Sequence, residues 1–160
     1  MSGPLHEQEF HAFDGKSADQ KIQEAADREE IRELVSRYAL GIARGAQVGH
    51  LFTEDGLFIQ RIPGLPPEQY QGKAALLPMY QNVADTVRPL PMIHNHIIDI
   101  DGDTARGQCS IELRMTHDGK SMIASGYYDD EYRRVDGRWR FAKRDATIFH
   151  LCTLQDGWAK

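Results

Sequence analysis

The stretch Met92–Leu113, MIHNHIIDIDGDTARGQCSIEL, decides how this sequence is expected to fold. An Asp-Gly pair at residues 101–102 separates two apolar runs, and this is the strongest short signal for a β-hairpin because both turn residues must reach positive φ. Side chains alternate between the two faces of a strand. His94 and His96 are therefore predicted to share one face of the first strand with Ile98 and Ile100.

Two further Asp-Gly pairs, at residues 118–119 and 136–137, divide the remainder of the second half in the same way. The four predicted strands cover residues 92–100, 103–115, 121–135 and 138–152. Such a meander buries one face only if another layer covers it, so helices from the first half are expected to pack there.

The first half contains the expected helices. Apolar residues at helical spacing run from Ile31 to Ile42, Ser17 and Gln20 fit a capping box, and Gly45 is expected to end the helix. After it we expect a short helix near residues 48–52, a turn at 53–56, a strand at 57–62, a proline-rich loop at 63–67 and a helix at 73–85. The predicted fold is one α+β domain, residues 17–155, with a polar arm at 1–16 and a tail at 156–160.

The composition excludes several classes of protein. The 160 residues are 41 % hydrophobic and 27 % charged, which is ordinary for one globular domain. A net charge of −5 argues against a nucleic-acid surface. No apolar stretch approaches the roughly 20 residues of a membrane span, and the N-terminus lacks the pattern of a signal peptide. We therefore expect a cytoplasmic protein whose cysteines, Cys109 and Cys152, are reduced core thiols.

Four stretches of the sequence together resemble a known family. They are REEIRELVSRYALGI (28–42), LFTEDGLF (51–58), IDIDGDTARGQC (98–109) and SGYYDDEYRRVDGRWRFAKR (125–144). The chain resembles the SnoaL-like branch of the NTF2-like superfamily from about residue 25 to 151. The resemblance implies a cone, a strongly curved antiparallel sheet wrapped around N-terminal helices with an internal apolar pocket. It also implies a homodimer or homotrimer and, in catalytic members, proton transfer on a small hydrophobic substrate without a cofactor.

This sequence departs from that family at two positions. Dehydratase and dehydrochlorinase relatives carry an Asp near the end of the first helix, where this chain has Ala43. They also carry a His at the start of the strand, where this chain has Pro91 and Met92. The usual Asp–His dyad is thus missing, and either other residues perform the chemistry or the chemistry has been lost.

Four residues are the candidates for catalysis. His94 or His96 could move a proton near neutral pH, or both could be structural. The resemblance implies that Tyr38 polarises a substrate oxygen and that Arg144 reaches the pocket mouth to stabilise negative charge. The alternatives are a core tyrosine and a surface ion pair of Arg144 with Asp130 or Glu131. The expected substrate-binding residues are Phe58, Tyr70, Tyr80, Met92, Cys109 and Tyr127.

A metal site is a weaker interpretation of the two histidines. A His-x-His pair on a strand could chelate a metal if His150 or Glu112 supplied a third ligand, but the spacing fits no zinc signature. The sequence also lacks a phosphate-binding loop, a dinucleotide fingerprint and a nucleophile elbow. We expect neither a metal nor another cofactor.

Three functions stay open on the sequence. The first is a lyase that eliminates water or a small fragment, such as formaldehyde by way of a quinone methide, from a small hydroxylated aromatic or polycyclic substrate. The second is an isomerase or cyclase that uses the same pocket. The third is a non-catalytic module that binds a small ligand or assembles subunits. No nucleic acid or membrane partner is expected.

Overall fold

The computed structural model describes residues 3–87 and 89–157, so the ends of the expected arm and tail, residues 1–2 and 158–160, lie outside the described residues. Two long helices, two short 3-10 turns and six strands make up the fold. In chain order they are η1 (Leu5–Glu7), α1 (Ala18–Ala43), η2 (Gly49–Leu51), β1 (Phe52–Arg61), β2 (Glu68–Gln71), α2 (Lys73–Thr86), β3 (Leu90–Asp101), β4 (Thr104–His117), β5 (Lys120–Val135) and β6 (Arg138–Thr153).

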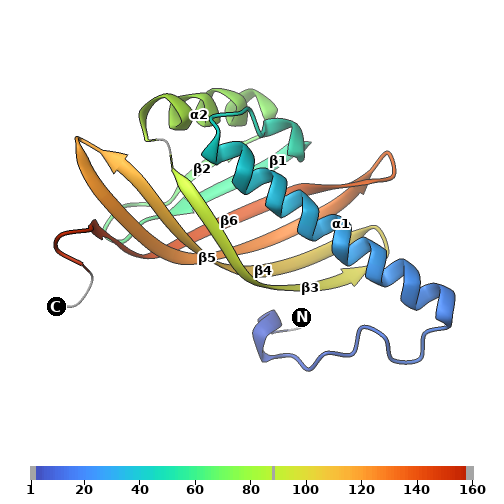
Figure 1. Cartoon of the computed structure of the whole chain (residues 1–160). Coiled ribbons are helices and arrows are strands. Elements are labelled where there is room, and N and C mark those ends of the chain that lie inside the picture. Colours follow the sequence, from blue (N-terminus) through green and yellow to red (C-terminus); the bar gives the residue numbers. More distant parts are fainter. Residues whose placement is uncertain (1–2, 88, 158–160) are drawn as a thin grey trace.

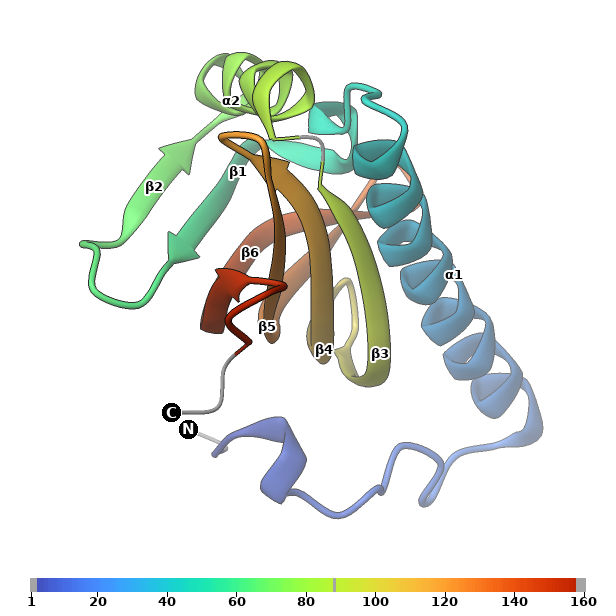
Figure 2. The same cartoon turned by 60° about the vertical axis from the view of Figure 1, so that its left-hand side comes forward.

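The strands form one curled sheet in the order β2-β1-β6-β5-β4-β3. All neighbours are antiparallel except β1 and β6, which pair in parallel. Helix α1 lies across the concave side of the sheet, and α2 packs beside β1 and β2 (Figure 1, Figure 2). The expected α+β class and curved sheet are confirmed, but the sheet is not wholly antiparallel as predicted, because of the β1–β6 pair. Below, the sheet face toward α1 is called the inner face and the opposite one the outer face.

Helix α1 begins where the sequence predicted. The Ser17 hydroxyl accepts a hydrogen bond from the Gln20 amide at 3.3 Å, and the Gln20 side chain accepts one from the Ser17 amide at 2.9 Å. This capping box satisfies two amides that would otherwise lack partners at the helix start. The helix ends at Ala43, and Gly45 follows with a φ of +68° that favours glycine.

The first strand and its neighbour differ from the expectation. Residues 53–56, predicted as a turn, belong to β1, which starts at Phe52 and has a register irregularity before Leu57. Gly56 makes this irregularity possible, since a Cβ there would lie 2.8 Å from the Phe52 Cβ. Strand β2 was not predicted as a strand, because its four residues, EQYQ, are polar and too few to show alternation.

The core lies between α1 and the inner face of the sheet. Its largest fully buried side chains include Trp139, Tyr132, Phe52 and Phe141, together with the charged Arg144. A fully buried arginine among aromatic rings is unusual in a core, because charged groups are costly to remove from water unless they are paired.

Within the described residues, neither helix is long and apolar enough to cross a membrane.

Candidate functional site

A bulge in β3 separates the two histidines. The pairing of β3 with β4 shifts by one residue between His94 and Ile97, and Asn95 adopts a φ of +53°. An extra residue in one strand reverses the alternation beyond it. His94 is therefore exposed on the outer face, whereas His96 is turned inward and half-buried. The prediction that both histidines share one face is wrong, and only His96 reaches the interior.

His96 meets Tyr132 in a notch left by a glycine. The His96 Nε2 atom lies 3.3 Å from the Tyr132 hydroxyl. Between them on β4 is Gly107, where a Cβ would lie 2.9 Å from Nε2 and 2.8 Å from the Tyr132 ring. Real Cβ atoms do not approach that closely, so any larger residue at this position would force the two side chains apart.

Tyr132 connects this histidine to a buried ion pair. Its hydroxyl donates a hydrogen bond of 2.8 Å to Asp130 Oδ2. Asp130 also accepts two hydrogen bonds from Arg144, from Nε at 2.9 Å and from Nη2 at 2.7 Å, and both of these side chains are completely buried. Charge-assisted bonds of this two-pronged kind are the strongest that side chains form.

A second bulge makes that ion pair possible. Counting back from the turn at 136–137, Asp130 would lie opposite Lys143, but Ala142 is an extra residue on β6 and shifts the register. Asp130 is therefore opposite Arg144 on the inner face. The predicted surface location of this ion pair is wrong. Arg144 does pair with Asp130, one of the two partners that the sequence suggested, but its side chain is completely buried.

Aromatic rings surround the Arg144 guanidinium on several sides. Its central carbon lies 3.9 Å from the ring centre of Tyr128, 4.2 Å from that of Phe141 and 4.3 Å from that of Tyr38. The Tyr80 hydroxyl donates to the Tyr38 hydroxyl at 3.1 Å. Cation–π contacts of this kind stabilise a desolvated arginine. We call His96, Tyr132, Asp130, Arg144 and Tyr38 the polar centre.

One donor of the polar centre lacks a partner. Arg144 Nη1 is buried and makes no hydrogen bond within the described residues. Nε and Nη2 both bind Asp130, and the guanidinium also interacts with the Tyr38 hydroxyl, whose pKa it lowers, so Nη1 is the nitrogen that lacks a well-formed hydrogen bond. A buried donor without an acceptor costs free energy, so such a group in a native protein needs an explanation. A ligand oxygen that accepts a hydrogen bond from Nη1 would provide one.

Burial sets the ionisation of the tyrosines. It raises the pKa of Tyr38, although the positive charge of Arg144 partly opposes this. Burial likewise holds the pKa values of Tyr80, Tyr128 and Tyr132 well above the usual value. These phenols are therefore neutral donors at pH 7. Burial also raises the pKa of Cys109 to about 12, so this thiol is not a nucleophile near neutrality.

Burial has the opposite effect on the histidine. It lowers the pKa of His96 from 6.5 to about 4, and the positive charges of Arg144 on β6 and Arg32 on α1 lower it further. The ring is therefore neutral at pH 7 and can accept a proton. Tyr132 and Asp130, both on β5, are the other ionisable groups of the polar centre close to it.

This shift predicts a pH-dependent stability. As pH falls from 6.5 to about 4, the unfolded chain protonates His96 while the folded chain does not. The free energy of unfolding should thus fall over this range, by up to about 3 kcal/mol from this residue. Urea unfolding at several pH values, compared with His96→Gln, measures the difference. Parallel pH curves for the two proteins would contradict the assignment.

The predicted binding residues divide between the two faces. Phe58, Tyr80 and Cys109 are buried on the inner side, where Phe58 and Tyr80 rings lie 5.8 Å apart. Tyr70 is half-buried, with its hydroxyl bound to Glu68. The other two lie away from the inner face. Met92 pairs with the exposed Glu112, and Tyr127, which alternates with the buried Tyr128, lines an outer hollow of about 590 Å³.

The polar centre and the glycine beside it include residues that the sequence analysis did not name as functional. Tyr132 and Gly107 were missed, and Asp130 was considered only as a surface partner of Arg144. The sequence contained a signal for Tyr132 and Asp130, because Tyr128, Asp130 and Tyr132 alternate along one strand and must share a face. Nothing local marks Gly107, whose role depends on side chains from two other strands.

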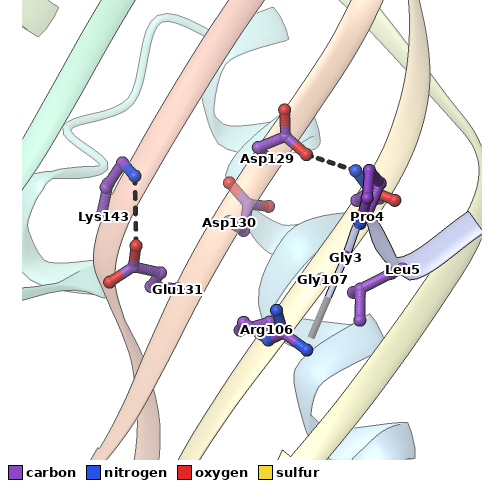
Figure 3. A pocket seen from close by; sticks show the side chains of 10 residues that line it. Gly3, Pro4, Leu5, Arg106, Gly107, Asp129, Asp130, Glu131 and Lys143 are labelled. Carbon is purple, nitrogen blue, oxygen red and sulfur yellow. Dashed lines mark hydrogen bonds and ion pairs between the residues drawn. The ribbon is translucent and has the colours of Figure 1, made fainter. Parts of the chain in front are cut away.

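The arm and the outer face form a separate, structural contact. Residues Gly3–Leu5 line a hollow of about 350 Å³ together with Arg106, Asp129, Glu131 and Lys143 (Figure 3). Its charged groups have partners within the protein, since Lys143 binds Glu131 at 3.1 Å and Asp129 accepts a hydrogen bond from Gln108 at 2.6 Å. Across the described part of the chain, no three His, Cys, Asp or Glu side chains gather as a metal site would require.

The sequence profile of the SnoaL-like domain matches residues 23–145. The chain belongs to the SnoaL-like domain family. Among curated proteins, none matches this sequence. Its NTF2-like fold is shared with many solved structures.

Three of these solved structures illustrate the range of the SnoaL-like fold. A single-residue variant of Rv3472 from Mycobacterium tuberculosis, a protein of unknown function, is 27 % identical with a TM-score of 0.70, over 88 % of this chain and 79 % of that one. A candidate scytalone dehydratase from Novosphingobium aromaticivorans is 17 % identical with a TM-score of 0.73, over 88 % and 93 %. Hexachlorocyclohexane dehydrochlorinase LinA-type3 from Novosphingobium barchaimii is 18 % identical with a TM-score of 0.74, over 88 % and 98 %. At such identities, the last two indicate the fold alone.

Proposed function

We propose that this SnoaL-like protein is a cofactor-independent lyase that eliminates water or a small fragment from a small hydroxylated aromatic or polycyclic substrate. The observation that carries the proposal is the unpartnered Arg144 Nη1, a buried donor held among aromatic rings, with no acceptor in the described part of the chain. In a site without water, a fixed donor of this kind stabilises negative charge that develops on a substrate oxygen.

A second donor supports the same role. Tyr80 donates its proton to the Tyr38 oxygen, so the Tyr38 proton is free for a substrate or leaving group. Burial keeps Tyr38 protonated at neutral pH by raising its pKa. Arg144 Nη1 and Tyr38 could then donate to substrate oxygens, with Arg144 stabilising a phenolate or enolate and Tyr38 assisting departure of a hydroxyl group.

The neutral His96 completes the proposed chemistry. Its ring takes a proton from substrate carbon or hydroxyl, the electron pair forms a new double bond, and the leaving hydroxyl departs as water with a proton from Tyr38 or the imidazolium. Loss of formaldehyde from a hydroxymethyl phenol would use the same groups, because the base removes the hydroxyl proton while the carbon–carbon bond breaks. The ring carbon then takes up a proton, and no cofactor is needed.

The surroundings favour an apolar substrate. On the inner face, the small residue Ala146 on β6 lies two residues from Arg144, and Ala124 on β5 is also buried. Half-buried apolar side chains pack against the core from the residue after β1 and from α2, β3 and β4: Ile62, Met79, Ile93, Leu113 and Met115. Apolar side chains of this kind suit an apolar substrate and exclude water from it.

A non-catalytic role is the second candidate, and one observation favours it. Most groups of the polar centre already have protein partners, as a structural network would. An isomerase or cyclase would use the same groups as a lyase and differ in the product. The experiment below separates all three.

The test is a cofactor-free screen of hydroxylated aromatic, polyketide and steroid compounds, read by mass spectrometry. We expect a product lighter by water or formaldehyde, and a loss of roughly 10²–10³ in kcat for Tyr38→Phe, as for removal of one oxyanion donor. A product of unchanged mass would identify an isomerase or cyclase. Compounds that raise the melting temperature without turnover would favour a binding module. Equal rates for wild type and Tyr38→Phe would remove Tyr38 from the mechanism.

A further inference from the structure

We infer that Tyr132, Asp130 and Gly107 hold His96 in the tautomer with a proton on Nε2, which makes Nδ1 the atom that accepts the substrate proton. This inference rests on the proposed function for its catalytic meaning, but the tautomer itself follows from the hydrogen bonds. Tyr132, Asp130 and Gly107 are thus positioning residues that act through His96.

The first step concerns the single proton of the Tyr132 hydroxyl. Two acceptors compete for it, the Asp130 carboxylate at 2.8 Å and the His96 Nε2 at 3.3 Å. An ionised carboxylate is the stronger acceptor, and it is also the closer one. Arg144 binds Asp130 through two nitrogens, which is the geometry of a carboxylate paired with a guanidinium. The Tyr132 proton therefore goes to Asp130.

The second step follows for the histidine. With its proton given to Asp130, the Tyr132 oxygen can only accept from His96. The contact with Nε2 is a hydrogen bond only if Nε2 carries the proton. Since the ring is neutral, Nδ1 then has the free lone pair. His96 Nδ1 has no hydrogen-bond partner among the residues that the structure describes, so the lone pair is available.

The third step concerns the space in which the two side chains meet. An alanine Cβ at position 107 would lie 2.9 Å from the His96 Nε2 and 3.0 Å from the Tyr132 oxygen. Both atoms of the hydrogen bond would have to move. The lack of a side chain at Gly107 therefore allows the His96 ring to lie against Tyr132, and an alanine there would separate them without changing any charge or donor.

The experiment is two-bond ¹H–¹⁵N correlation NMR of ¹⁵N-histidine-labelled full-length protein at pH 7, with His96 assigned by its absence in His96→Gln. We expect a protonated Nε2 and an unprotonated Nδ1 in wild type. Tyr132→Phe should lower the ratio of the two tautomers roughly fivefold, as for loss of one hydrogen bond. Gly107→Ala should do the same. Tyr128→Phe removes a buried hydroxyl from the same strand and face, but not the one that contacts His96, and should leave the His96 signals unchanged.

The outcomes separate this inference from the proposed function. A protonated Nδ1 in wild type, or an unchanged tautomer ratio in both Tyr132→Phe and Gly107→Ala, would overturn the inference even if the protein turns over a substrate. The expected tautomer in a protein that turns over nothing would uphold the positioning and remove the proposed lyase. If Gly107→Ala does not fold, Tyr132→Phe carries the test. With a substrate in hand, Tyr132→Phe should lower kcat and leave KM within about twofold.

Discussion

Replacing Arg144 with methionine is expected to lower the free energy of unfolding by about 3–5 kcal/mol, because it leaves the Asp130 carboxylate buried without a counter-charge. Asp130 would keep only the Tyr132 hydroxyl as a donor. The cost should appear as a lower urea midpoint at an unchanged slope, measured by circular dichroism. A loss below about 1 kcal/mol would mean that the pair is not desolvated as the structure indicates.

The sheet offers a matched control for this experiment. Glu131 and Lys143 are the next residues on the same two strands, and they form an ion pair of 3.1 Å on the outer face, with side chains 55 % and 31 % exposed. Lys143→Met should cost less than about 1 kcal/mol, since exposed pairs contribute little. The double variant Asp130→Asn, Arg144→Met removes both buried charges and should regain about 2 kcal/mol relative to Arg144→Met.

The second large effect is expected at the histidine. His96→Gln should lower kcat/KM for any substrate found by roughly 10²–10⁴, the usual contribution of a positioned proton acceptor. His117→Gln, at an exposed site on the β4–β5 hairpin, serves as the control and should retain full activity. If instead His94→Gln abolished turnover while His96→Gln did not, the inward histidine would not be the base.

The pH profile of the wild-type enzyme provides an independent check on this assignment. A base with a pKa of about 4 stays neutral through the weakly acidic range. kcat/KM should therefore remain level from about pH 7 to about 5 and fall only as pH approaches 4, provided that the protein stays folded. An ordinary, exposed histidine would instead produce the fall near a pH of about 6.5. A midpoint there would contradict burial of the catalytic base.

The sequence predicted regular structure well and failed where a strand carries one extra residue. Alternation from the turn at 101–102 places both histidines inward, and only the bulge at Asn95 turns His94 outward. Asn is one of the few residues that tolerate positive φ, which was a weak signal. The extra Ala142 on β6 likewise turns Arg144 inward, toward Asp130. The alanine side chain itself gives no sequence signal of a bulge.

Long-range packing accounts for the rest of what the sequence analysis missed. The space that Gly107 leaves open matters only because His96 and Tyr132, from β3 and β5, meet above it. Burial of a charged Arg144 depends on three aromatic rings from α1, β5 and β6. Such features depend on contacts between strands and helices far apart in the sequence, and no pattern within a single element contains them.

The parallel pairing of β1 with β6 has a consequence for how the chain reaches its native state. Residues 57–61 find their partners only at 143–147, so this pairing can form only after both segments have been synthesised. Until then β1 exposes the backbone edge that β6 will cover. Contacts of such long sequence separation slow folding, and the nascent chain passes through a stage in which its helices and its first hairpin precede the strand that joins them.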